Sequence, residues 1–84
     1  MEVSEVKGMS IELSDKLKNK KVNYDLDALY EVSYKLGAAT LCLIDNNLKK
    51  SKLFKEIDTL KIKINNQIDD KLDKIYGKIK ILPD

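Results

Sequence analysis

The 84-residue chain has no histidine, and its 16 basic residues are all lysine, so arginine is absent as well. Without histidine the chain has no imidazole base at neutral pH and lacks the commonest nitrogen ligand for zinc. Without arginine it has no planar guanidinium for two-pronged binding to phosphate or guanine. We therefore expect a protein that is not an enzyme, with no catalytic residue, no cofactor and no metal.

Cysteine, proline and glycine are scarce, at one, one and three residues. The lone Cys42 cannot form a disulfide within the chain, which favours a reducing compartment such as the cytoplasm. We place Cys42 on the polar side of its helix, in a structural role, because no histidine is present to activate the thiol. Proline and glycine are too few for the turns of a β-rich domain, so the sequence predicts an all-α fold.

Long apolar runs are also missing, since no stretch approaches the roughly 18 uncharged apolar residues of a membrane-spanning helix. The chain opens with Glu2 and Glu5 where a signal peptide has basic residues followed by an apolar block. We expect neither a membrane segment nor a signal peptide. The predicted localisation is cytoplasmic.

Apolar periodicity predicts one domain, 1–84, with helices over about 3–20, 25–45 and 52–80. In the third helix the apolar stripe runs from Leu53 to Leu82, 29 residues in eight steps, or about 3.6 residues per step. That period matches a nearly straight helix, so we expect bundle packing: the second and third helices form an antiparallel hairpin, and the first packs beside it.

The second helix is apolar over more than half of its circumference. One row of side chains includes Leu29, Leu36 and Leu43, and a second row contains Tyr30, Tyr34, Gly37 and Leu41. Two apolar rows require two packing partners. The small residues 37–40 would let the backbone of a neighbouring helix approach closely. The tyrosines have an alternative interpretation, at the edge of the core within one chain.

The third helix is longer than the second, so it either overhangs its partners or breaks at Gly77. Ile62 lies off its stripe without an obvious partner within the chain. These features predict a homodimeric helical bundle. The predicted interface residues are Tyr30, Tyr34, Gly37, Leu41, Ile62 and Tyr76.

A lysine cluster precedes the third helix, with Lys49, Lys50 and Lys52 as possible anion ligands. Lysines at a helix N-terminus oppose the helix dipole, but together with free N–H groups they can bind an anion. The alternative interpretations are a solvated turn or a helix that begins elsewhere. The run of Asp69, Asp70 and Asp73 lacks the glycine of a calcium loop, and we interpret it as a solvated helix face.

These observations predict a small helical protein–protein interaction module, an adaptor or regulator that self-associates. The alternative is a nucleic-acid or anion-binding protein that uses lysine clusters at helix ends. A net charge of only +2 gives weak electrostatic attraction to a duplex, and no aromatic residue lies between Lys49 and Lys52. The identity of any protein partner cannot be predicted from these patterns.

Overall fold

The computed structural model describes residues 1–19 and 23–79, with side chains as far as Gly77. Its helices are α1 (Val3–Lys18), α2 (Leu26–Asp45) and α3 (Lys52–Ile79), and the described residues contain no strand. The prediction of an all-α fold with three helices is confirmed. The predicted end of the first helix at residue 20 and of the third stripe at Leu82 lie outside the described residues.

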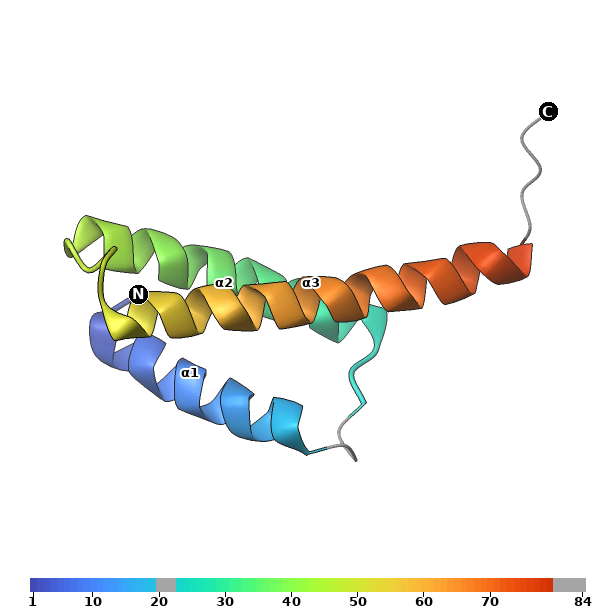
Figure 1. Ribbon diagram of the computed structural model, residues 1–84, viewed down its shortest axis with the longest axis horizontal. Helices are drawn as coiled ribbons and strands as arrows, with labels where there is room; N and C mark the ends of the chain where they lie inside the picture. Colours follow the sequence, from blue (N-terminus) through green and yellow to red (C-terminus); the bar gives the residue numbers. More distant parts are fainter. Residues whose placement is uncertain (20–22, 80–84) are drawn as a thin grey trace.

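The helices α2 and α3 form an antiparallel pair, and this pairing is the most extensive in the molecule (Figure 1). Helix α1 packs across one side of the pair and contacts both of its helices. The three helices run up, down and up, with α1 and α3 pointing the same general way (Figure 1). On the opposite side of the α2–α3 pair no described helix lies.

A short turn joins α2 to α3, and its backbone forms a Schellman motif. Asn47 adopts the left-handed conformation with a φ of 59°, which asparagine tolerates better than most residues. The N–H of Leu48 donates to the carbonyl of Leu43 (2.8 Å), and the N–H of Asn47 donates to that of Ile44 (3.0 Å). The turn therefore satisfies the last carbonyls of α2 and returns Leu48 to the core.

Side-chain caps fix where α2 and α3 begin. The carboxylate of Asp25 accepts a hydrogen bond from the N–H of Ala28 (2.8 Å). The hydroxyl of Ser51 accepts from the N–H of Phe54 (3.1 Å) and donates to the carbonyl of Leu48 (2.6 Å). A side-chain oxygen that caps a helix in this way contributes about 1 kcal/mol to its stability.

The core lies where the three helices meet. On α2 its centre is Leu29, Leu36 and Leu43, which recur every seven residues, or about two turns, and are fully buried. Burying each leucine stabilises the fold by about 1.5–3 kcal/mol relative to leaving it exposed. The other core residues are Val6, Leu13, Ala39, Cys42, Ile57, Leu60, Ile64 and Ile68.

The C-terminal part of α3 projects beyond both other helices, as the difference in helix lengths predicted (Figure 1). The molecule is 49 Å long, and α3 accounts for most of that length. Along the α3 stripe the exposed fraction rises from 0% at Ile64 to 44% at Ile75. The stripe thus continues past the point where the chain itself can cover it.

Candidate functional site

The surface of the α2–α3 pair that faces away from α1, here called the open face, carries most of the predicted interface residues. We define it by Tyr30, Tyr34, Gly37 and Leu41 of α2 and Ile62 of α3. Tyr34 is 81% exposed, Leu41 63% and Ile62 55%. Large apolar side chains this exposed, gathered on one side of a small protein, are typical of a surface that binds another macromolecule.

A hydrogen bond between the helices shows why Leu41 and Ile62 share this face. The Nζ of Lys61 donates to the Oγ1 of Thr40 at 3.2 Å, so these two residues lie level with each other across the pair. Leu41 and Ile62 are the next residues along their antiparallel helices, and each step turns about 100° around its helix. Because the helices run in opposite directions, both steps lead to the same side.

Contacts with α1 lie on the other side of the pair. The hydroxyl of Ser10 donates to the carboxylate of Glu56 on α3 (3.4 Å), and Ser10 is itself buried. The thiol of Cys42 on α2 donates to the carbonyl of Met1 (3.2 Å). These contacts place α1 opposite the open face.

Cys42 corrects one prediction from the sequence. We placed it on the polar side of its helix, but it is buried, with 7% of its surface exposed. The start of the chain covers this part of α2, as the hydrogen bond to Met1 shows. The position of α1 relative to α2 is a tertiary property, so the periodicity of α2 alone did not reveal it.

The middle of the open face is hollow because its residues are small. A depression of about 300 Å³ is lined by Tyr34, Gly37, Ala38 and Leu41. A Cβ atom built on Gly37 would have no atom within 4 Å, so no neighbouring backbone of this chain makes the close approach that the small residues permit. The depression is therefore open to a side chain from another molecule.

Two further exposed residues extend the open face, and one was missed from the sequence. Ile44 is 42% exposed and lies three residues after Leu41, a helical spacing that was enough to find it. Tyr76 is 58% exposed and lies just past Ile75, which lines a second depression with Leu26 at the start of α2. Tyr76 lies 14 residues, or about four turns, after Ile62 and so on the same side of α3, near the level at which α2 begins.

Charged residues border the open face, and most of them are acidic. By helical position Asp27 and Asp45 lie beside the open face on α2. On α3, Asp58 and Asp69 lie in the same row as Ile62, four residues before it and seven after it, and Asp73 lies next to that row. All five are exposed. Lys55 lies among the α3 residues and is also exposed. The charge on α3 is thus uneven, with Lys55 and Asp58 near its start and Asp69 and Asp73 toward its end.

The predicted lysine cluster lies where α3 begins, since α3 starts at Lys52 and has no acidic residue in its first turn. Lys49, Lys50 and Lys52 are all exposed. However, the Ser51 hydroxyl already accepts a hydrogen bond from the N–H of Phe54. One of the backbone groups that an anion would use is therefore occupied.

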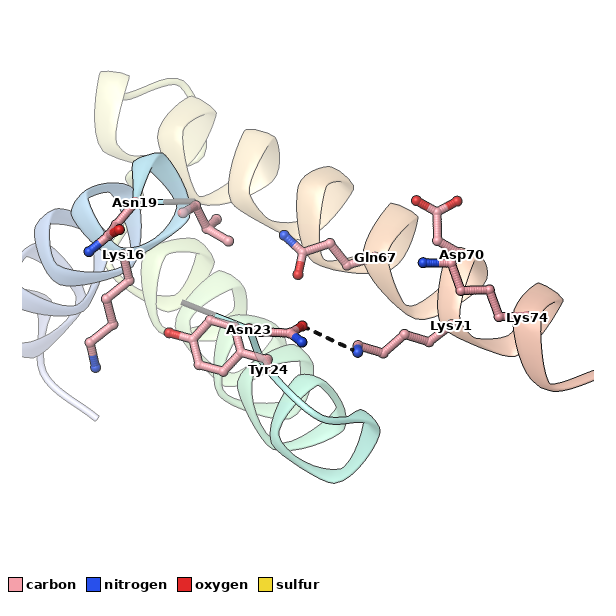
Figure 2. A pocket seen from close by; sticks show the side chains of 9 residues that line it. Lys16, Asn19, Asn23, Tyr24, Gln67, Asp70, Lys71 and Lys74 are labelled. Atoms are coloured by element: carbon pink, nitrogen blue, oxygen red, sulfur yellow. Dashed lines mark hydrogen bonds between the residues drawn. The ribbon is translucent and has the colours of Figure 1, made fainter. Parts of the chain in front are cut away.

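Another depression is polar and lies elsewhere, between the end of α1, the residues before α2, and α3 (Figure 2). Its volume is about 330 Å³, and Lys71 Nζ donates to Asn23 Oδ1 across it at 3.5 Å. None of the predicted site residues lines it. The lining residues are Lys16, Leu17, Asn19, Asn23, Tyr24, Gln67, Asp70, Lys71 and Lys74.

One ion pair on α1 shifts the pKa values of both partners. Lys16 Nζ donates to Glu12 Oε1 at 2.8 Å. This hydrogen bond, together with the attraction between the two charges, lowers the pKa of Glu12 from its ordinary value of 4.5 and raises the pKa of Lys16 above 10.5. Both groups are exposed on α1, away from the open face.

Among residues 1–19 and 23–79, no group of three or more histidine, cysteine, aspartate or glutamate residues could share a metal ion. No helix in the described part of the chain is both long enough and apolar enough to cross a membrane. Comparisons with protein-family models, curated proteins and solved structures each find no match. The residues and their geometry alone must carry a functional interpretation.

Proposed function

We propose that this protein is a non-enzymatic helical interaction module, an adaptor or regulator, that self-associates through the open face. The observation that carries the proposal is a contrast within α2. Tyr34 is 81% exposed and Leu41 63% exposed, whereas Leu29 and Leu36 on the same helix are fully buried. A helix with two apolar faces needs two partners, and the described chain supplies one. A cytoplasmic location belongs to the proposal, because Cys42 has no cysteine partner in the chain.

The size of the face indicates how much of it a partner must use. A helix as long as α2 extends about 30 Å and is about 10 Å wide, so alone it offers a footprint of about 300 Å². Stable interfaces bury about 800 Å² on each partner. Self-association therefore needs both α2 and α3, which is consistent with the exposed Ile62 on α3.

Light scattering over a range of protein concentrations tests the proposal. We expect the mass of a dimer for the natural chain and of a monomer for Leu41→Asp, because a carboxylate would be buried unpaired in the interface. Ile11→Asp is the matched control, since Ile11 is 66% exposed but lies on α1. A monomeric natural chain, or equal effects of the two substitutions, would overturn the proposal.

Anion or nucleic-acid binding is the second candidate function. It is supported by the position of the helix start. Because α3 begins at Lys52, the lysines at 49, 50 and 52 surround a helix N-terminus, where free N–H groups can bind an anion. A binding series with short DNA and RNA duplexes tests it. Binding at low salt that falls steeply as salt is added supports this function, and absence of binding at low salt excludes it.

A further inference from the structure

Resting on the proposed self-association, we infer that the second copy packs antiparallel on the open face. The two-fold axis passes between the two α2 helices, level with the peptide bond that joins Gly37 to Ala38. A two-fold interface must be complementary to itself, so a residue before the axis meets one equally far after it. Tyr34 precedes this midpoint by the same distance that Leu41 follows it. Each tyrosine ring therefore packs on the leucine of the other copy.

The middle of the face fits this arrangement sterically. Gly37 and Ala38 have small side chains, and the Cβ position of Gly37 is open. Two α2 helices can thus approach to the lower end of the usual range of about 8–10 Å between axes. The depression of about 300 Å³ beside these residues is positioned to receive Leu41 of the second copy.

The charges on α3 select the antiparallel direction. Counting from the Thr40–Lys61 hydrogen bond, the midpoint on α2 lies level with Lys63 and Ile64 on α3. An antiparallel copy brings Lys55 between Asp69 and Asp73 of its partner. In a parallel dimer that joins the same α2 faces, the two-fold axis runs along the helices, so the two α3 helices lie on opposite sides of the α2 pair and Lys55 meets neither carboxylate. Two symmetry-related antiparallel contacts are unfavourable, because Asp58 of each copy then faces Asp69 of the other.

The turn between α2 and α3 adds to the same preference. In the antiparallel arrangement the exposed Lys49 and Lys50 lie at the end where α2 of the second copy begins, near its exposed Asp27. In a parallel arrangement they would lie near each other instead. Exposed pairs of this kind contribute little affinity, but they discriminate between orientations.

Cross-linking of single cysteines separates the orientations. Tyr30 and Asp45 lie equally far from the midpoint on either side, about 22 Å apart along α2. In a Cys42→Ser background, Tyr30→Cys and Asp45→Cys would each be treated alone, and then mixed, with a bismaleimide that reaches about half that distance. We expect covalent dimer only in the mixture, because only unlike cysteines are then adjacent.

Each other outcome contradicts the inference in a recognisable way. Covalent dimer from either variant alone shows a parallel arrangement, and a dimer by light scattering without any cross-link shows a different face; both overturn the inference but leave self-association standing. A monomer at every concentration overturns both. If either variant fails to fold by circular dichroism, Gly37→Cys next to the axis replaces it, and the inference then requires that this variant form a disulfide with itself.

Discussion

The two faces of α2 have similar apolar content but opposite environments. Leu29, Leu36 and Leu43 are fully buried against α1 and α3, whereas Tyr34 and Leu41 are mostly exposed. The difference is set by tertiary arrangement, because three helices can enclose only one side of the α2–α3 pair. An apolar face that its own chain leaves uncovered is a place where another molecule can bind.

The largest expected effect, on the free energy of unfolding, comes from a substitution on the buried face of α2. Leu36→Ala should lower the free energy of unfolding by about 3 kcal/mol, because it removes a fully buried side chain and leaves a cavity. Leu41→Ala should change it by no more than about 0.5 kcal/mol at concentrations where the protein is monomeric. Urea unfolding measures both, and equal losses would show that the two faces are not different.

A smaller effect, on association alone, is expected at the centre of the open face. Gly37→Leu should weaken self-association at least tenfold, or by about 1.4 kcal/mol, because the added side chain separates the two copies. Within one chain its Cβ meets nothing, so monomer stability should rise slightly with the improved helix propensity.

Gly8→Leu provides the control for this substitution, since Gly8 also has open space around its Cβ but lies on α1. It should improve helix propensity in the same way and leave the dissociation constant unchanged. Analytical ultracentrifugation of both variants measures the comparison. If Gly37→Leu associates as tightly as the natural chain, the inferred close approach of the two α2 helices is contradicted.

A change of charge on the open face should strengthen self-association modestly. In the antiparallel dimer Asp58→Lys replaces a repulsion with an attraction to Asp69, so association should tighten several-fold, with each exposed pair contributing about 0.5–1 kcal/mol. Asp15→Lys makes the same change of charge on α1 and should have no such effect. Unchanged or weaker association of Asp58→Lys would contradict the antiparallel pairing of Asp58 with Asp69.

The smallest effect belongs to the exposed Glu12–Lys16 pair, which shows how little a solvated contact contributes. The lowered pKa of Glu12 contributes folding stability that is present above pH 4.5 and is lost as the pH falls through the folded-state pKa. The raised pKa of Lys16 contributes folding stability that is present below pH 10.5 and is lost as the pH rises through the folded-state pKa. Titration by NMR should show the pKa of Glu12 rising toward its ordinary value in Lys16→Met. An unchanged value would show that the pair does not form in solution.

Much of the fold could be predicted from the sequence because it is local. The number of helices follows from periodicity, and Asp25 before Leu26 signals the cap that starts α2. The burial of Cys42 could not be predicted, because it depends on where the start of α1 packs. Nor could the hydrogen bond between Thr40 and Lys61, which sets the register of α2 against α3.

The candidate site divides in the same way. Helical spacing was enough to place Tyr30, Tyr34, Gly37 and Leu41 on one row, but the sequence did not show whether α1 covers that row. Ile62 is predicted as an interface residue because it lies off the α3 stripe, without any indication of its neighbours on α2. Its position beside Leu41 follows from the pairing of two helices that are distant in sequence.

A dilution series of methyl NMR spectra tests most directly whether a second copy covers the open face. The methyl signals of Leu41 and Ile62 should shift together as the dimer dissociates, with a single dissociation constant. The signal of Ile11, equally exposed but on α1, should stay in place. If Leu41 and Ile62 keep constant shifts at every concentration while the protein is folded, or if only Ile11 moves, self-association through the open face is contradicted.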